Sequence, residues 1–283
     1  MKKRILVIGA TGLIGNAVAK QLYYDGSHVI VLSRNKNKAR GLFQSDIEII
    51  EADVLDPTAI RHAFTGIDGV YISLPDNIVP VAMPAIVEAA RESRVKQLVY
   101  TSGCTVRKEN AVHPMIKNHL AGEECVEGCG ITYTILKLTM IMDMIPRYAN
   151  NGKPFIIGKQ INGFSWIHTS DIARMASAAF FSENASNKKL TLWGIERSTI
   201  ADAVESYNRT LNLAARKVKP TPYWQAGLLS LIVGEKLKYA ISIFRYFDEH
   251  PEEGDPEEAY SILGRPQMTL ESYFRLEKEH GIK

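Results

Sequence analysis

The segment from Gly9 to Gly15, Gly-Ala-Thr-Gly-Leu-Ile-Gly, constrains the fold of this chain more than any other feature. It follows four consecutive apolar residues at 5–8, which predict a buried parallel strand. It precedes residues 16–22, whose apolar positions recur at helical spacing. A strand, a glycine turn and a helix in this order suit a dinucleotide pyrophosphate, because the helix N-terminus offers unpaired N–H groups to the anion.

Each of the three glycines has an expected role. Gly9 permits the tight turn, Gly12 lets the backbone approach the phosphates, and Gly15 allows the helix to pack close to the strand. A purely structural turn is the alternative interpretation. Because the glycines stand between a predicted strand and a predicted helix, the sequence favours a dinucleotide site.

Strand and helix patterns alternate through the first half of the chain. Helices are predicted at 79–90 and from about 116 to 127, where Gly128 ends the second one. This alternation predicts an α/β fold, a doubly wound parallel Rossmann sheet with its ligand at the carboxyl ends of the strands. The expected strands are 4–8, 28–33, 47–52, 69–74, 97–102 and 132–137.

The regular alternation is lost from about residue 138. Residues 150–154 predict a loop, and a helix is expected to start with Ser170 or Asp171 as its cap. Thr199 stands three residues before Asp202, the spacing of a capping box at the start of another helix.

The last part of the chain is predicted to be mostly helical. Pro220 and Pro222 mark a break, which a long apolar helical stretch follows to about Phe247. Residues 248–258 contain seven acids among eleven positions, which predicts a solvated loop, with a ligand-gating segment as the alternative.

The expected division of the chain follows from these patterns. Residues 1–137 form the dinucleotide-binding domain, completed by about 156–182. Residues 138–155 and 183–283 form a smaller C-terminal lobe on the substrate side rather than an independent domain.

Composition excludes several classes of protein. The net charge of +3 is spread along the chain, so it gives no reason to expect nucleic-acid or membrane binding. The longest apolar stretch is far too short to cross a bilayer, and no leader segment precedes the first strand. The cysteines, Cys104, Cys125 and Cys129, have no metal-ligand spacing, and the last two are expected to pack as thiols on a helix. A cytoplasmic, metal-free protein is expected.

The chain resembles the NmrA-like branch of the atypical short-chain dehydrogenases/reductases over about residues 4–182. This family includes NADPH-dependent quinone and dye reductases as well as redox sensors that are not catalytic. The likeness of the C-terminal hundred residues is looser. The segments that carry the resemblance are 9–15, with glycines in a G-x-x-G-x-x-G spacing, 31–34, 51–54, 98–103 and 130–137.

The end of the second predicted strand indicates which cofactor is preferred. An enzyme that uses NAD normally places an acid there, whereas this chain has Ser33 and Arg34, followed by Lys36 and Lys38. A guanidinium can grip a 2′-phosphate that an acid would repel, so NADP(H) is preferred over NAD(H). The alternative is that this arginine lies on an exposed loop and does not contact the cofactor.

The resemblance implies further cofactor contacts. Asp53 and Val54 match the family position beside the adenine, and the segment from Ser73 through Leu74 to Pro75 matches the place where the backbone passes the middle of the cofactor. The complete expected set is Gly9, Thr11, Gly12, Leu13, Ile14, Gly15, Ser33, Arg34, Asp53, Val54, Ser73, Leu74, Pro75, Thr101, Ser102 and His119.

The catalytic pattern of ordinary short-chain dehydrogenases is incomplete. Those enzymes use a serine and a Tyr-x-x-x-Lys pair, but Met115 and His119 occupy the tyrosine and lysine positions here. Glu123 lies one turn after His119, where its carboxylate is expected to orient the imidazole or favour its charged form, with an inconsequential surface pair as the alternative. The catalytic candidates are Ser102, His119 and Lys137, the last replacing an arginine found in many relatives.

An adaptable apolar substrate wall is expected from Met140, Met142, Met144 and Trp166, and plain core packing is the alternative for at least half of such residues. The favoured function is NADPH-dependent reduction of an electron-poor aromatic or quinone-like small molecule by direct hydride transfer. A non-catalytic NADP sensor, with a protein partner, is the first alternative. A nucleotide-sugar epimerase is the second, although it too needs the missing tyrosine and lysine.

Overall fold

The structure is a computed structural model that describes residues 2–214 and 217–281. The chain divides into two compact units. Unit 1 comprises Met1–Leu138, Thr169–Leu192 and Asp255–Arg265, and unit 2 comprises Thr139–His168, Trp193–Gly254 and Pro266–Lys283. The sequence expectation completed the first domain with about 156–182. In this division 156–168 belong to unit 2, and unit 1 instead takes in the strand that ends at Leu192.

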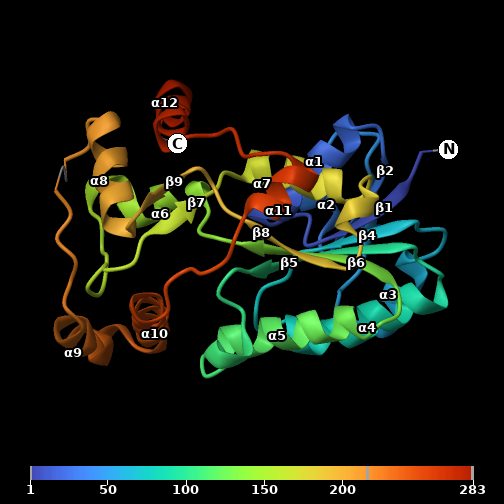
Figure 1. The fold of residues 1–283 in the computed structure, drawn as a ribbon, viewed down its shortest axis with the longest axis horizontal. Coiled ribbons are helices and arrows are strands. Elements are labelled where there is room, and N and C mark those ends of the chain that lie inside the picture. Colours follow the sequence, from blue (N-terminus) through green and yellow to red (C-terminus); the bar gives the residue numbers. More distant parts are fainter. Residues whose placement is uncertain (1, 215–216, 282–283) are drawn as a thin grey trace. The chain divides into compact units, whose positions relative to one another are not determined.

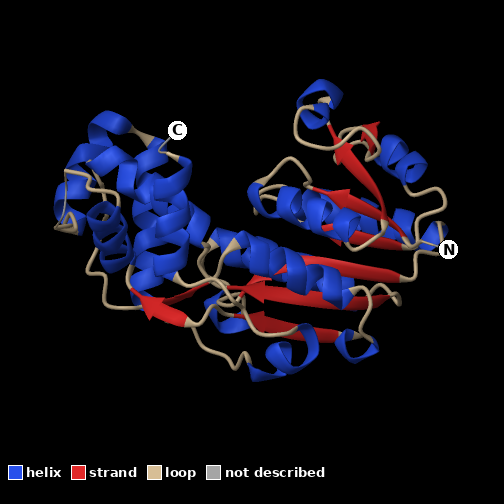
Figure 2. Ribbon diagram, turned by 90° about the horizontal axis from the view of Figure 1, so that it is seen from above, coloured by secondary structure: helices blue, strands red, loops and turns tan. Residues whose placement is uncertain are grey.

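Unit 1 is built on a parallel sheet in the order β3-β2-β1-β4-β5-β6-β8. Strand order reverses between β1 and β4, which creates the crevice where doubly wound sheets bind ligands. Figure 2 shows the strands fanning out with the twist usual for such sheets. The strands are β1 Arg4–Ile8, β2 His28–Ser33, β3 Glu48–Glu51, β4 Gly69–Ile72, β5 Gln97–Gly103, β6 Thr132–Leu138 and β8 Lys188–Leu192.

Helices cover both faces of this sheet (Figure 1). The helices α1 and α7 pack together on one face, and α3, α4 and α5 line the other. The central strands β1, β2, β4 and β5 are buried on both sides, whereas the edge strands β3 and β8 are partly exposed. The helices of unit 1 are α1 Leu13–Tyr24, α2 Lys36–Arg40, α3 Pro57–Ala63, α4 Val79–Glu92, α5 Pro114–Glu127, α7 Thr169–Ala179 and α11 Glu257–Leu263, with 3₁₀ turns η1 Lys108–Asn110 and η4 Glu183–Ala185.

Unit 2 is mainly helical, with an antiparallel pair of short strands. Its apolar core includes Trp166, Tyr207 and Phe274, which come from three distant parts of the sequence. The elements are η2 Met142–Met144, α6 Ile145–Ala149, η3 Asn150–Gly152, β7 Phe164–Trp166, β9 Glu196–Ser198, α8 Ile200–Thr210, α9 Tyr223–Val233, α10 Glu235–Glu249 and α12 Leu270–His280.

The doubly wound fold and all six expected strands are confirmed, with ends that differ by at most two residues. The capping box is also confirmed, because the Thr199 hydroxyl accepts the N–H of Asp202. The start predicted for α7 is wrong, because the helix already includes Thr169. Cys129 lies beyond the end of α5, and it is buried as a free thiol.

Two predictions for the C-terminal part are also wrong. The long helical stretch after Pro222 is two helices, because Gly234 has a φ of +85° between α9 and α10. The acidic stretch is not wholly solvated. Glu252 is buried, its carboxylate accepting hydrogen bonds from the Thr139 hydroxyl and the Ser165 N–H, and α11 begins at Glu257.

Candidate functional site

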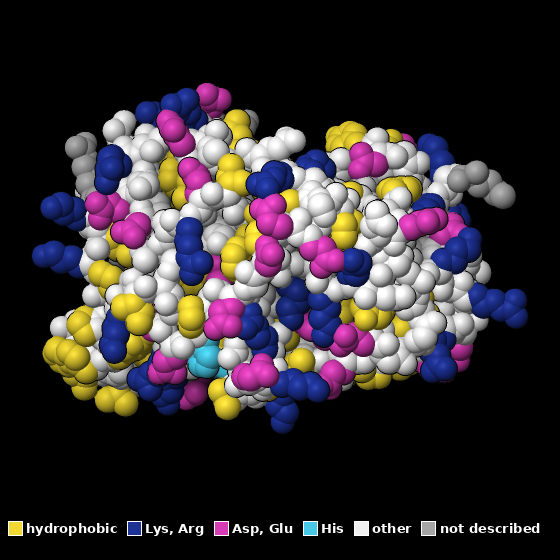
Figure 3. All heavy atoms as spheres, viewed as in Figure 1, with side chains coloured by type: hydrophobic (Ala, Val, Ile, Leu, Met, Phe, Trp, Pro, Cys, Tyr) yellow, Lys and Arg dark blue, Asp and Glu magenta, His cyan; other side chains and the backbone are white. Residues whose placement is uncertain are grey.

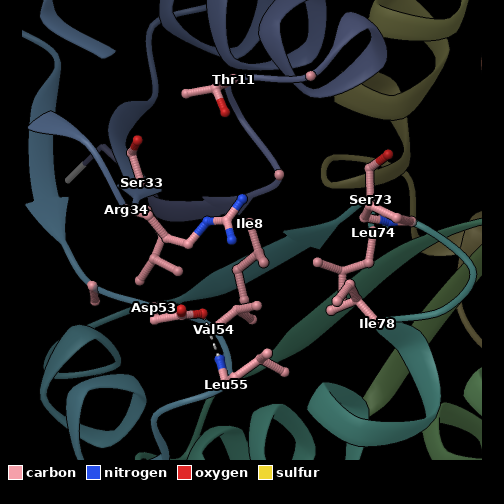
Figure 4. A pocket seen from close by; sticks show the side chains of 15 residues that line it. Ile8, Thr11, Ser33, Arg34, Asp53, Val54, Leu55, Ser73, Leu74 and Ile78 are labelled. Carbon is pink, nitrogen blue, oxygen red and sulfur yellow. Dashed lines mark hydrogen bonds between the residues drawn. The ribbon is translucent and has the colours of Figure 1, made fainter. Parts of the chain in front are cut away.

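A pocket opens in unit 1 at the carboxyl ends of β1, β2, β3 and β4 (Figure 4). It is therefore located at the point where the strand order reverses, as the alternating pattern predicts. Its lining includes ten of the expected cofactor residues: Gly9, Thr11, Gly12, Ser33, Arg34, Asp53, Val54, Ser73, Leu74 and Pro75.

The glycine turn forms one wall of this pocket. Gly9 has a φ of +84°, and a Cβ there would stand 1.9 Å from the carbonyl oxygen of Ser73. A Cβ on Gly15 would stand 2.3 Å from the Gly9 oxygen, so this glycine allows α1 to approach the turn. Both are needed by the fold itself.

Gly12 is different. Its φ is −85° and its ψ 171°, values that any residue adopts, and a Cβ there meets only the Gly9 oxygen, at 3.2 Å. Gly12 nevertheless lines the pocket. The protein alone therefore constrains Gly12 less than Gly9 or Gly15, requiring only a small shift of the Gly9 oxygen, whereas a ligand held close to the backbone gives a further reason for glycine.

The N-terminus of α1 faces the same pocket through Gly12, its N-cap residue. No side chain caps the helix, and its first turn, which includes Leu13, Ile14 and Gly15, contains no acid. Uncapped N–H groups and the positive end of the helix dipole favour an anion at this position. The turn thus fits the pyrophosphate of a dinucleotide.

The end of β2 brings a positive charge to the pocket. Figure 4 shows the Arg34 guanidinium reaching into it. Arg34 has no hydrogen bond or ion pair with the residues that the structure describes. The hydroxyl of Ser33 is already engaged in a local turn, donating to the Asn35 carbonyl and accepting the Asn35 N–H. Arg34 is therefore the side chain at this strand end that remains available to a ligand.

The other side of the pocket is partly apolar. Asp53 accepts the N–H of Leu55, and this bond fixes its carboxylate at the rim. The lining residues that the sequence expectation missed are Ile8, Leu32, Ala52, Leu55 and Ile78. Most of them adjoin an expected residue at the end of a strand, and that proximity is the signal by which they could have been found.

Two of the remaining candidates, Ser102 and Lys137, belong to an ionic cluster around the buried Glu123. The Ser102 hydroxyl donates to Glu123 Oε1 at 2.5 Å, and Lys137 Nζ lies 2.8 Å from the same oxygen. Lys189 Nζ is 3.0 Å from Glu123 Oε2. Lys137 also donates to the carbonyl oxygen of Val106, and burial lowers the pKa of its ammonium.

His119 does not pair with Glu123 as expected. Its Nδ1 lies 2.9 Å from the hydroxyl of Tyr100, while the Glu123 carboxylate holds Ser102 and the two lysines. Burial lowers the pKa of His119, outweighing the attraction of Asp76 and Glu123 for the charged form. Glu123 therefore favours an imidazolium, as expected, but desolvation dominates and the net effect favours the neutral ring.

Tyr100 is a site residue that sequence reasoning missed. It is fully buried, and burial strongly raises the pKa of its phenol, so the hydroxyl keeps its proton in the hydrogen bond with His119 Nδ1. Tyr100 and Ser102 are two apart on β5, so they project from the same face of the sheet. A Cβ on Gly122 would stand 2.7 Å from the Tyr100 oxygen, so this glycine makes room for the phenol.

The other expected residues lie elsewhere. Thr101 is bonded to Tyr71, hydroxyl to hydroxyl, at 2.6 Å, and faces away from Ser102. In unit 2, Met142 and Trp166 are fully buried in the core, which leaves them no surface for a substrate. Met140 and Met144 remain partly exposed.

A parallel sheet with a crevice at its reversal point and an uncapped helix behind a glycine turn defines a dinucleotide-binding protein of the Rossmann class. Comparison with known proteins agrees. The chain belongs to the NAD(P)H-binding family, which matches residues 9–183. Its fold is that of the NmrA-like short-chain dehydrogenases/reductases, and the proteins similar to it include oxidoreductases. The family resemblance is therefore confirmed.

Two relatives and one solved structure illustrate the similarity. Photosystem II assembly factor Ycf39 of Cyanophora paradoxa is 26% identical over 218 residues, covering 72% of this chain and 68% of the relative. NAD(P)H azoreductase of Xenophilus azovorans is 25% identical over 224 residues, 77% of each chain. The Escherichia coli quinone oxidoreductase QOR2, complexed with NADPH, shares the fold with a TM-score of 0.79 at 20% identity, covering 96% of this chain and 99% of that one.

Within 2–214 and 217–281, His, Cys, Asp and Glu side chains form no group of three or more suited to a metal ion. No helix in the same ranges is long and apolar enough to span a membrane.

Proposed function

We propose that this protein is an NADPH-dependent reductase that transfers hydride directly to an electron-poor aromatic or quinone-like small molecule. The observation that carries the proposal is the Arg34 guanidinium, which reaches into the pocket where an NAD enzyme has an acid. The relationship to azoreductase and quinone oxidoreductase proteins supports the reaction class.

Each part of the pocket has a role toward the cofactor. The uncapped α1 N-terminus takes the pyrophosphate, and the bare Gly12 lets the backbone approach it. Arg34 binds the 2′-phosphate, while Asp53, Val54 and the apolar residues that line the pocket contact the adenosine end. When bound, NADPH supplies a hydride from C4 of the nicotinamide.

The β5–α5 region then acts at the other end of the cofactor. His119 is a neutral imidazole, and we assign its Nδ1 as the acceptor of the Tyr100 hydroxyl, which leaves its proton on Nε2. We assign it a positioning role as a hydrogen-bond donor rather than as an imidazolium acid. Lys137 is likewise a positioning residue, because its ammonium is held by Glu123 and Val106.

This arrangement suits a quinone-like acceptor. Position 115 holds methionine, so the tyrosine that protonates a reduced carbonyl is missing. A quinone accepts the hydride directly from NADPH and takes one further proton from water, which gives the hydroquinone and NADP⁺. Catalysis then consists mainly of orienting the two reactants.

A non-catalytic NADP sensor is the second candidate, and the same methionine favours it. Anaerobic NADPH oxidation, followed across a panel of quinones, azo dyes and enones, separates the two functions. The reductase predicts steady oxidation with at least one acceptor, and its loss in Gly12→Val. Tight NADPH binding with no oxidation by any acceptor identifies the sensor.

A further inference from the structure

The helix α9 exposes a continuous apolar face. Trp224, Leu228, Leu231 and Ile232 follow one another at spacings of four, three and one residues, so they share a side of the helix. Their exposed fractions are 66%, 59%, 77% and 86%. Leu229 and Val233 widen this face, and Figure 3 shows apolar side chains gathered over α9.

The pattern of α9 is the reverse of an ordinary surface helix. Its buried positions, Ala226 and Ser230, carry small side chains, with the half-buried Gly227 between them, and the helix packs against α10. The large apolar side chains point outward instead. A globular core does not require this arrangement, because burial would stabilise the fold only if the large residues faced inward. Contiguous exposed apolar surface of this kind marks a contact site.

Charge indicates what this face contacts. Residues 217–238 contain four lysines, at 217 and 219 before the helix and at 236 and 238 after it, against a single acid, Glu235. All four lysines are exposed, and α9 itself has no charged residue. An apolar face between two basic ends is complementary to a surface whose outer layer is anionic and whose interior is apolar.

We propose that α9 docks this protein onto an anionic lipid surface. The helix has eleven residues, about 16 Å of length, so it lies in the interface and cannot cross a bilayer. Trp224 sits at the headgroup level, while Leu228, Leu231 and Ile232 enter the acyl boundary. This proposal goes beyond the proposed reductase function, and it replaces the expectation from net charge that no membrane binds, since the lysines are concentrated locally.

A second copy of the chain is a poorer occupant. If two α9 helices paired about a two-fold axis, antiparallel packing would bring the lysines before one helix beside those after the other. Parallel packing would place like ends together. Either arrangement juxtaposes positive charges, which an anionic surface neutralises.

Vesicle sedimentation tests the proposal with the intact protein. Vesicles with about one third phosphatidylglycerol in phosphatidylcholine are expected to bind it, and pure phosphatidylcholine vesicles to bind it far less. The variant Leu228→Ser/Ile232→Ser is expected to lower the binding constant at least about tenfold. Replacing the four lysines by glutamine should lower it about six hundredfold, since each lysine near such a surface contributes about a fivefold factor.

The matched control is Val81→Ser, which removes a side chain of comparable exposure (66%) from α4 in unit 1. It should bind vesicles like the parent protein. Quenching of Trp224 fluorescence by brominated acyl chains reports insertion when it is measured in a Trp193→Phe background, because Trp193 is partly exposed whereas Trp166 is fully buried. Unchanged thermal unfolding shows that each variant is folded.

Three results would overturn the proposal. The first is no binding to phosphatidylglycerol vesicles, and the second is binding that neither variant weakens. The third is a concentration-dependent dimer, without vesicle binding, that Leu228→Ser/Ile232→Ser dissociates. That result would assign α9 to contact with a second copy.

Discussion

At the scale of single residues, the glycines of the β1–α1 turn separate what the fold needs from what a ligand needs. Gly9 is required by its positive φ and by the nearby Ser73 carbonyl, so its replacement strains the chain. Gly12 has an ordinary backbone conformation, and a Cβ there would meet one protein atom, the Gly9 oxygen, at 3.2 Å. The sequence pattern predicts both glycines but cannot tell these two causes apart, because the difference lies in contacts with a distant strand.

Gly12→Val is expected to weaken NADPH and NADH binding at least about a hundredfold, because the new side chain occupies the place of the pyrophosphate. The protein should remain folded, since a Cβ at Gly12 meets only the Gly9 oxygen at 3.2 Å. Calorimetric titration with both nucleotides checks this. Gly41→Val is the matched control, at a position outside the pocket with ordinary spacing to its neighbours. Normal NADPH binding by Gly12→Val would mean that the turn is only structural.

Arg34→Ala should weaken NADPH about tenfold or more and leave NADH nearly unchanged, because a hydrogen bond to a charged group contributes about 1.5–3 kcal/mol. The measurement is the ratio of the two dissociation constants in parent and variant. Arg61→Ala removes an exposed arginine from α3 as a control for net charge. Equal affinities of the parent protein for the two nucleotides would refute the preference.

At the scale of elements, β5 and α5 carry a group of hydrogen-bonded polar side chains that the sequence predicts only in part. Ser102 and His119 are predictable from their positions, but Tyr100 is paired to His119 through tertiary packing that Gly122 permits. The break between α9 and α10 and the burial of Glu252 were unpredictable for a related reason. Helical periodicity continues across Gly234, and the partners of Glu252 are 87 and 113 residues away in sequence.

The lowered pKa of His119 has a consequence for pH dependence. The ring is neutral above its ordinary pKa of about 6.5 and remains neutral for some distance below it, so it does not titrate near pH 7. His119→Ala should therefore lower turnover by a similar factor at pH 6.5 and pH 8, whereas Met115→Leu should change it less than a few-fold. Tyr100→Phe should leave the ring neutral in this range, because burial is the main cause of the lowered pKa of His119. A neutral-pH inflection in the parent that His119→Ala abolishes would instead indicate an imidazolium acid.

Glu123→Gln tests the ionic cluster of the same two elements. The substitution leaves the buried ammonium of Lys137 next to a neutral amide, whereas the partly exposed Lys189 keeps its ion pair with Glu127. Removing one partner of a buried ion pair costs about 3–5 kcal/mol, so the free energy of unfolding should fall by about that amount in denaturant titrations. Glu88→Gln, at an exposed pair on α4, should change it by less than about 1 kcal/mol. Equal effects of the two substitutions would show that the cluster stabilises the fold no more than an exposed ion pair does.

At the scale of the whole molecule, unit 1 was predictable because its strands are consecutive apolar runs followed by glycine, serine or aspartate at the carboxyl ends. Those few residues also mark most of the pocket. Unit 2 was not predictable to the same degree. Its core joins residues from 142 to 274. The sequence alone therefore does not distinguish whether Met142 and Trp166 line a substrate site or pack in the core, and their burial in the structure decides it.

The central claim is that this protein orients NADPH for direct hydride transfer. Anaerobic single-turnover oxidation of NADPH, followed at the nicotinamide absorbance with a quinone acceptor, tests it when the cofactor is deuterated at C4 in one or the other stereochemical position. The account predicts that only one of the two deuterated forms reacts several-fold more slowly, and that its deuterium leaves the nicotinamide ring, because the pocket presents a single face of the ring to the acceptor. Equal rates for both forms, or tight binding with no oxidation, would contradict it.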